Sequence, residues 1–279
     1  MPLIYINWNP DPEILSVGSF SIRWYGVLFA AGFFIGYFIV KDFFKREGLS
    51  MKLLDKLATY LVIATVVGAR LGHCLFYEPS YYLSNPLEIL KVWEGGLASH
   101  GGAIGIIIAL WLYSRKYDVK ILWILDRTAI PTALVAFFIR MGNLVNSEIF
   151  GVPTDLPWGF RFINAYDPTL AIDPRHPTQI YEGLVYLLIF AFLMYQYYRK
   201  REERNNGFFL SMFLILVFSA RFFIEFLKEP QVGFESEILL NMGQILSIPF
   251  VIAGGVILYL INKGKAERDN KPFRRKKKK

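Results

Sequence analysis

An arginine interrupts the apolar run Phe137-Phe138-Ile139-Arg140-Met141-Gly142-Asn143-Leu144-Val145-Asn146-Ser147-Glu148. The residues before it, 129–139, are apolar enough to lie in a bilayer, where a guanidinium costs roughly 2.5–3.5 kcal/mol on insertion scales. Asn143 and Asn146 follow at i+3 and i+6 and therefore share its helix face. Because a helix does not carry this cost without a partner for the charge, we expect the function on this face.

The composition is that of a membrane protein. Of the 279 residues, 54% are hydrophobic and 17% aromatic, whereas soluble domains average about 45–50% apolar residues even with glycine counted. The net charge of +8 lies in residues 263–279, which hold ten Lys/Arg and two acidic residues, so the neutral remainder excludes a nucleic-acid binder. We expect Cys74, the only cysteine, to be a buried inert thiol. Residues 1–19 lack the basic region and cleavage site of a signal peptide, so we expect none.

Seven segments are long and apolar enough to cross a membrane, which takes about 20 residues. They are residues 20–41, 53–77, 97–114, 122–145, 180–198, 207–227 and 239–261. The third and fourth are the least clearly separated, because Lys120, Asp126 and Arg127 crowd the gap between them. We therefore predict an all-α integral membrane protein with seven transmembrane helices and no internal repeat.

Basic residues orient this bundle. Clusters of Lys and Arg follow the first, third, fifth and seventh segments, whereas the connections 78–96, 146–179 and 228–238 are acid-balanced and rich in Pro and Gly. Since cytoplasmic loops are enriched in Lys and Arg, we place the N-terminus outside and the C-terminus inside. Residues 1–262 then form one membrane domain with an extracytoplasmic loop region at 146–179. Residues 263–279 form a cytoplasmic tail that binds anionic lipid headgroups.

In this orientation, polar residues from separate segments reach one depth near the outer leaflet. They are Tyr25, His100, Arg140, Asn143, Asn146, His176, Gln179, Tyr181, Glu182, Arg221 and Glu225. Polar residues with only structural roles have no reason to agree in depth, so we expect a site there.

Some of these residues also have a structural interpretation. The glycines beside His100 can form a helix-packing surface, and Arg221 and Glu225, at i and i+4, can neutralise each other. Arg140 has no nearby acid before Glu148. Its partner is then Glu225, Glu148 or a ligand phosphate, which a guanidinium matches in bidentate geometry.

A secondary transporter is the main alternative, because intramembrane Arg, Glu and His also mark transport pathways. The missing repeat and the bias toward one leaflet oppose it, while a structural membrane subunit stays open. A retinal protein is excluded, since residues 239–261 contain no lysine for a Schiff base. Three histidines on three segments lack metal-ligand spacing, and we expect no metal or other cofactor.

Five motifs carry a family resemblance. They are Arg23-Trp24-Tyr25-Gly26, Gly95-Gly96-Leu97-Ala98-Ser99-His100-Gly101-Gly102, Arg140-Met141-Gly142-Asn143-Leu144-Val145-Asn146-Ser147-Glu148-Ile149-Phe150-Gly151, His176-Pro177-Thr178-Gln179-Ile180-Tyr181-Glu182 and Arg221-Phe222-Phe223-Ile224-Glu225-Phe226. In their order and spacing, from about residue 15 to 260, the chain resembles bacterial prolipoprotein diacylglyceryl transferases. That family's fold is a seven-span bundle with its N-terminus outside, in agreement with the topology above.

The resemblance implies a reaction and its residues. In the bacterial cytoplasmic membrane, the family moves the sn-1,2-diacylglyceryl group of phosphatidylglycerol onto the lipobox cysteine of preprolipoproteins, forming a thioether and releasing glycerol phosphate. By position, Arg140 and Arg221 match its essential arginines, and His100 and Tyr25 match its other critical residues. Supporting positions are matched by Asn143, Asn146, Glu148, Gly151 and Glu225, with His176, Gln179, Tyr181 and Glu182 as further candidates.

This chemistry makes two demands. The thiol must become a thiolate, and the departing phosphate must be stabilised as negative charge accumulates. We expect Arg140 and Arg221 to bind the phosphate, with Glu225 holding Arg221. Asn143 and Asn146 then bond the glycerol headgroup.

Two points stay open. His100 is the candidate general base, since an ordinary imidazole titrates at about pH 6.5, but a thiol pKa lowered by arginine makes a base unnecessary. Family members often have a tyrosine one turn before the arginine of the sixth span, and here that position is Val217. The hydroxyl is therefore dispensable in this chain or supplied by another group.

Overall fold

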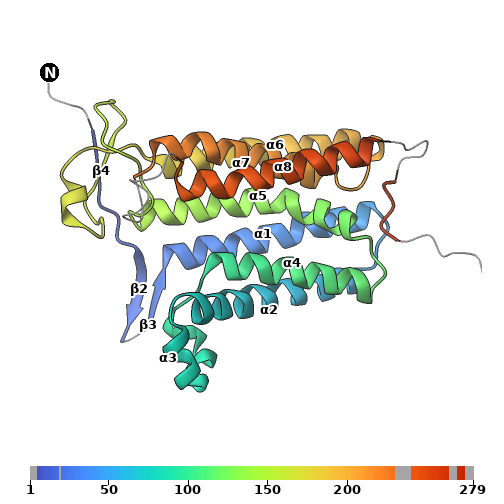
Figure 1. Cartoon of the computed structure of the whole chain (residues 1–279), viewed down its shortest axis with the longest axis horizontal. Helices are drawn as coiled ribbons and strands as arrows, with labels where there is room; N and C mark the ends of the chain where they lie inside the picture. The colour runs from blue at the N-terminus through green and yellow to red at the C-terminus, as the bar shows by residue number, and fades with distance from the viewer. Residues whose placement is uncertain (1–4, 19, 230–239, 264–268, 274–279) are drawn as a thin grey trace, which may run out of the picture. The chain divides into compact units, whose positions relative to one another are not determined.

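The computed structural model describes residues 5–18, 20–229, 240–263 and 269–273. Its helices are α1 (Trp24–Arg46), α2 (Met51–Phe76), α3 (Pro79–Ser84), α4 (Ser99–Lys116), α5 (Ile121–Val145), α6 (Thr178–Lys200), α7 (Phe208–Ile224) and α8 (Met242–Asn262) (Figure 1). Short 3-10 turns are η1 (Pro86–Leu90), η2 (Val92–Glu94), η3 (Pro168–Ala171), η4 (Arg201–Glu203) and η5 (Glu225–Leu227). The strands are β1 (Ile6–Trp8), β2 (Glu13–Val17), β3 (Phe20–Arg23) and β4 (Phe160–Phe162).

Within the described ranges, six helices are long and apolar enough to cross a membrane, namely α1, α2, α5, α6 with η4, α7 with η5, and α8. They confirm a mostly helical, multi-pass membrane protein. The remaining expected segment, 97–114, forms α4, which has 18 residues and polar residues at both ends. At 1.5 Å per residue such a helix spans about 27 Å, slightly less than a hydrocarbon core of about 30 Å.

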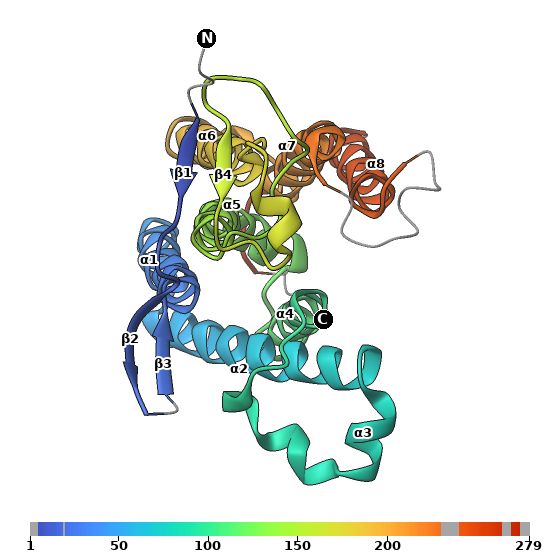
Figure 2. The same cartoon turned by 90° about the vertical axis from the view of Figure 1, so that its left-hand side faces the viewer.

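The first long helix begins later than expected, because the residues before Trp24 form strand β3. This strand pairs antiparallel with β2, with Leu15 opposite Ile22. Strand β1 pairs in parallel with β4, with Ile6 opposite Phe160 (Figure 2). Hydropathy did not indicate either two-stranded sheet, because strands of 3 to 5 residues carry too little periodicity.

The chain divides into two compact units. The first contains Met1–Ile39 and Asp126–Asn270, and the second contains Val40–Leu125 and Lys271–Lys279. In the first unit, α7 packs beside both α6 and α8 (Figure 1). In the second, α2 packs along α4, and α3 lies on the connection between them (Figure 2).

A small apolar core joins the loop region 146–179 to the end of α5. Leu144, Phe150, Phe160 and Phe162 are buried together in it. Trp8 packs against this core and donates its indole N–H to the carbonyl of Leu144 at 2.7 Å. Strand β1 and the loop region therefore fix the end of α5, where the Arg140 face lies.

Asp126 is not part of a gap but a buried residue of α5 that caps α7. Its carboxylate accepts the backbone N–H groups of Gly207 and Leu210, each at 2.8 Å. The first turn of a helix leaves such donors without intrahelical partners, and a negative charge there is favourable. Asp126, which made the boundary between the third and fourth segments hard to read in the sequence, thus stabilises the start of α7.

Glycine brings α2 and α4 close together in the second unit. A Cβ on Gly101 would lie 2.7 Å from the Cα of Gly72, and its other near neighbour is the backbone of Gly68. Small residues allow this approach between membrane helices. The helix-packing interpretation of the glycines beside His100 is therefore confirmed for Gly101.

The expected basic tail, 263–279, falls mostly outside the described residues, which include only Lys263 and 269–273 of it. One described part is anchored, since Asn206 donates its backbone N–H to the carbonyl of Asp269 at 2.8 Å. Binding of the tail to lipid headgroups stays a prediction.

Replacing Gly101 with alanine is expected to lower the free energy of unfolding by roughly 1–3 kcal/mol, because the added methyl group meets backbone that cannot move aside. The midpoint of detergent or thermal unfolding measures the change. Gly255→Ala on α8 is the matched control, since a Cβ there meets nothing within 4 Å. Equal losses in both variants contradict the prediction.

Candidate active site

Arg140 on α5 is paired with Glu182 on α6. The Nε of Arg140 lies 2.7 Å from Oε2 of Glu182, and their side chains are 11% and 0% exposed. The sequence analysis considered Glu225, Glu148 or a phosphate as the partner, so it missed Glu182. Which helices are neighbours cannot be read from the sequence. Gly183, next to Glu182 on α6, lies against Met141 of α5, since a Cβ there would lie 2.7 Å from Cε of Met141.

Lys228 joins the pair of Arg140 and Glu182 in one charged cluster with Glu225 and Arg221, and the sequence did not indicate Lys228 as a site residue. Its Nζ lies 3.0 Å from Oε1 of Glu182 and 3.0 Å from Oε2 of Glu225, and its side chain is 2% exposed. After α7, the chain tightens into the 3-10 turn Glu225–Leu227, so that Lys228 lies inside rather than in a solvent-exposed connection. Its i+3 spacing from Glu225 was the only signal in the sequence.

Arg221 is the most exposed cation of this cluster. Its Nε lies 4.0 Å from Oε2 of Glu225, so the expected i,i+4 pair is long, and Lys228 bonds Glu225 more closely. In the described part of the chain, that Nε has no hydrogen-bond partner. The side chain is 33% exposed, three times the value for Arg140. Because the Nε itself is buried, an anion can reach Arg221 only at the exposed part of its side chain.

Asn143 connects Arg140 to Glu148. It accepts a hydrogen bond from Nη1 of Arg140 at 3.1 Å and donates one to Oε1 of Glu148 at 2.8 Å. Asn146 donates to the same carboxylate oxygen at 3.3 Å. The Oδ1 of Asn146 is buried without a hydrogen-bond partner among the described residues, so one acceptor of this residue is unused.

The turn after α5, which carries Glu148, has a strained backbone. Ser147 and Ile149 have φ angles of 53° and 60°. Such left-handed conformations cost on the order of 1–3 kcal/mol in residues other than glycine. The start of α6 holds the turn, since Gln179 donates to the carbonyl of Glu148 at 2.8 Å and Thr178 to that of Ile149 at 3.0 Å.

Two glycines admit side chains that larger residues would exclude. A Cβ on Gly142 would lie 2.7 Å from the ring of Tyr25, which thus packs on the Arg140 helix. A Cβ on Gly151 would lie 2.7 Å from Cβ of His176. The charge of Arg140 acts on the Tyr25 hydroxyl. The first unit therefore brings Tyr25 and Gly151 into the surroundings of the cluster.

His176 and Tyr181 form a pair of their own in the first unit. The Nδ1 of His176 lies 3.2 Å from the Tyr181 hydroxyl, which also accepts the indole N–H of Trp158 at 2.9 Å. Burial lowers the pKa of His176 below its ordinary value of 6.5. The structure thus places this pair in contact with Trp158, on the loop region.

His100 belongs to the second unit, where it lies in the first turn of α4. Its ring centroid is 5.3 Å from that of Phe76 and 5.9 Å from that of Tyr77. Its assignment as the general base stays a prediction. Among the described residues of both units, no group of three or more His, Cys, Asp or Glu side chains could hold a metal ion.

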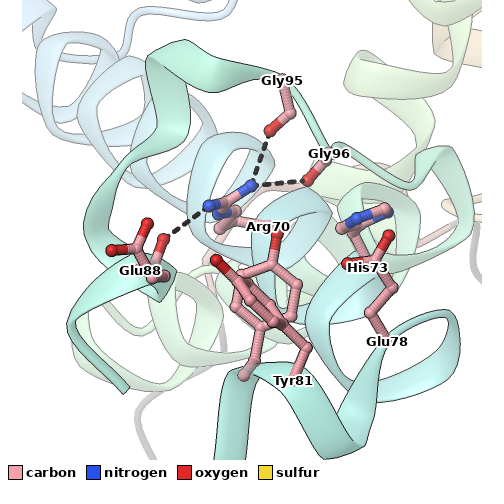
Figure 3. A pocket seen from close by; sticks show the side chains of 8 residues that line it. Arg70, His73, Glu78, Tyr81, Glu88, Gly95 and Gly96 are labelled. Atoms are coloured by element: carbon pink, nitrogen blue, oxygen red, sulfur yellow. Dashed lines mark hydrogen bonds between the residues drawn. The ribbon is translucent and has the colours of Figure 1, made fainter. Parts of the chain in front are cut away.

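The second unit also contains a polar pocket of about 300 Å³ (Figure 3). It is lined by Arg70, His73, Glu78, Tyr81, Tyr82, Glu88, Gly95 and Gly96. Arg70, 4% exposed, donates to the carbonyls of Glu88 (2.6 Å), Ile89 (3.0 Å), Gly95 (2.6 Å) and Gly96 (3.3 Å). This buried arginine donates its hydrogen bonds to the backbone between α3 and α4, so its role is structural.

Comparison with known proteins decides the family. The model of the family described as prolipoprotein diacylglyceryl transferase matches residues 12–260. The chain belongs to this family. The resemblance noted in the motifs is thereby confirmed, and the chain is a membrane-embedded transferase of lipoprotein biosynthesis.

Curated relatives agree over nearly their whole length, and each is named phosphatidylglycerol–prolipoprotein diacylglyceryl transferase. The relative from Tolumonas auensis is 50% identical over 260 residues, covering 93% of this chain and 98% of its own. The one from Porphyromonas gingivalis is 51% identical over 261 residues, covering 90% and 92%. The one from Bacteroides fragilis is 42% identical over 276 residues, covering 95% and 98%. None of these findings favours the transporter that the sequence left open.

The imidazole of His176 in this transferase is expected to take up a proton only below about pH 6.5, the value for an unfolded histidine, because burial lowers its pKa. Its contribution to stability is then complete above that pH and is lost as the pH falls from there through the lower pKa of the folded state. NMR titration of the three histidine rings, assigned with His176→Asn, measures the midpoint. A midpoint at or above 6.5 contradicts the expectation.

Proposed function

We propose that this transferase moves the sn-1,2-diacylglyceryl group of phosphatidylglycerol to the lipobox cysteine of preprolipoproteins. The cysteine sulfur bonds to the glycerol carbon as the bond from that carbon to the phosphate oxygen breaks. Glycerol phosphate leaves, and the thiol proton passes to a base. The observation that carries the assignment of the site is Arg221, a cation whose side chain is 33% exposed and which lies in one cluster with the buried pair of Arg140 and Glu182.

Arg140 and Arg221 bind the lipid phosphate and stabilise it as the leaving group. Guanidinium groups suit this task because they are permanently charged and match phosphate oxygens with two parallel donors. Glu182 holds Arg140 in place in advance at 2.7 Å, so little reorganisation of that guanidinium is needed as charge develops. Glu225 lies 4.0 Å from Nε of Arg221, and its negative charge favours the position of that guanidinium without a hydrogen bond to this atom. Lys228 acts on both carboxylates and thereby supports both arginines.

The glycerol headgroup bonds the amides next to Arg140. Asn146 offers the acceptor Oδ1, which is suited to a glycerol hydroxyl. Asn143, held between Arg140 and Glu148, orients the guanidinium. Gln179 holds the turn at Glu148 through its bond to that carbonyl, and Gly151 lets His176 pack against the same segment. The pair of His176 and Tyr181 supports this segment from its outer side.

The thiol is activated by His100, with Tyr25 as a further group near the reacting atoms. His100 is exposed at the start of α4, and an imidazole is suited to accept a proton at neutral pH. Tyr25 lies in the field of both Arg140 and Glu148.

The enzyme is placed in the bacterial cytoplasmic membrane with seven spans, α4 included, its N-terminus outside and its C-terminus inside. The last turns of α1, α4 and α6 carry basic pairs, in support of cytoplasmic ends there. Arg140 lies near the end of α5 and Glu182 near the start of α6, in support of a site that faces the outer leaflet. Residues 1–262 act as one catalytic domain, and the tail 263–279 binds anionic headgroups.

Arg221→Gln is expected to lower kcat by roughly 10²-fold, the usual loss when one donor to developing negative charge is removed. Arg221→Lys keeps the charge but loses the planar fork, so its rate should be intermediate. Purified protein, phosphatidylglycerol vesicles and a lipobox peptide are combined, and mass spectrometry detects the gain of one diacylglyceryl group on cysteine. Arg23→Gln is the control, since that side chain is 61% exposed. Full activity in Arg221→Gln contradicts the assigned role.

Replacing His100 with glutamine is expected to remove the rise of rate with pH on the acid side, because glutamine cannot accept the thiol proton. The same assay is run from pH 5 to 9, with His73→Gln as a matched histidine control. His73 shares Tyr77 as a neighbour with His100 but has no part in the proposed proton transfer, so its loss should leave the profile unchanged. If His100→Gln keeps the wild-type profile, His100 is not the base.

A further inference from the structure

We infer that the hydroxyl of Tyr186 is a positioning group for diacylglyceryl transfer and sets Arg140 through Glu182. Tyr186 lies on α6 one turn after Glu182 and is 3% exposed. Its hydroxyl donates to Oε1 of Glu182 at 3.1 Å. The inference rests on the proposed role of Arg140 and Arg221 in phosphate binding.

The two oxygens of Glu182 have different tasks. Oε1 receives Tyr186 at 3.1 Å and Lys228 at 3.0 Å, while Oε2 faces Nε of Arg140 at 2.7 Å. Lys228 alone would leave the carboxylate free to turn, because an ammonium is a point charge with rotatable donors. The Tyr186 hydroxyl is a second donor to Oε1 and fixes the plane of the Glu182 carboxylate. The orientation of the Arg140 guanidinium toward the phosphate is fixed with it.

The Tyr186 hydroxyl orients the Glu182 carboxylate without adding a charge to the cluster. Burying a phenol among apolar helices is unfavourable unless its hydroxyl is bonded, and a phenylalanine would fill nearly the same volume without that requirement. Arg140 and Arg221 are both among the charged groups that act on this hydroxyl, so it lies within the cluster. A role in packing alone does not account for a hydroxyl at this place.

This contact also answers the question raised by Val217. Val217 is buried on α7 one turn before Arg221, so a tyrosine there would approach the cluster from the Arg221 face. In this chain Tyr186 supplies a hydroxyl to the same cluster from α6. If the inference holds, a hydroxyl introduced at position 217 can replace that of Tyr186.

Tyr186→Phe tests the inference in the vesicle assay. We expect kcat to fall roughly ten- to hundredfold, the range for losing a hydrogen bond to a charged group, while KM for phosphatidylglycerol changes less than about threefold, since the loss appears as charge develops. Tyr195→Phe on the same helix is the matched control, because that side chain is 57% exposed. Unchanged kcat in Tyr186→Phe overturns the inference.

A rescue separates positioning from packing. Tyr186→Phe combined with Val217→Tyr should regain most of the lost kcat, whereas Tyr186→Phe with Val217→Phe should not, because only the first restores a hydroxyl. Equal turnover in the two double variants overturns the inference, whether both recover or neither does. Wild-type turnover in Arg221→Gln would instead remove the proposed phosphate site, and it is measured in the same preparation.

Discussion

The ion pair between Arg140 and Glu182 is the contact on which the fold and the site both depend. It joins α5 to α6 at 2.7 Å between two largely buried side chains. Removing one partner of a buried pair costs roughly 3–5 kcal/mol, because the other charge is left unpaired. Lys228 and Tyr186 bond the free oxygen of Glu182, and Asn143 bonds the guanidinium. The relative register of the two helices and the direction of Arg140 are thus fixed by the same atoms.

A buried arginine does not by itself mark a ligand site, as Arg70 demonstrates. Its guanidinium donates four hydrogen bonds to backbone carbonyls and holds the connection between α3 and α4. Arg221 is more exposed and has an Nε without a hydrogen-bond partner among the described residues. The distinction lies in exposure and in the bonds already made rather than in charge, and this is why the proposed phosphate site is placed at Arg221 and not at the polar pocket beside Arg70.

Sequence predicted the long helices well, because the cost of exposing backbone and polar groups in lipid requires about 20 apolar residues per span. The same cost singled out Arg140 and Arg221. Sequence could not identify Glu182 as the partner, since this depends on which helices are adjacent. It also missed Lys228, because only the 3-10 turn after α7 directs that residue inward. Short strands and the capping role of Asp126 likewise arise from tertiary contacts that no local pattern encodes.

The charges of the cluster bear on how the proposed site would both hold and release a phosphate. The contacts join three cations, Arg140, Arg221 and Lys228, to three carboxylates, Glu148, Glu182 and Glu225, so the cluster is formally neutral. Its attraction for an anion comes from orientation, because Glu182 and Glu225 are at most 8% exposed while Arg221 is 33% exposed. Preorganised donors of this kind act most strongly on charge that develops in the transition state. Since no net positive charge retains the leaving glycerol phosphate, which carries more negative charge than the diester, the proposed arrangement favours turnover over tight binding of the product.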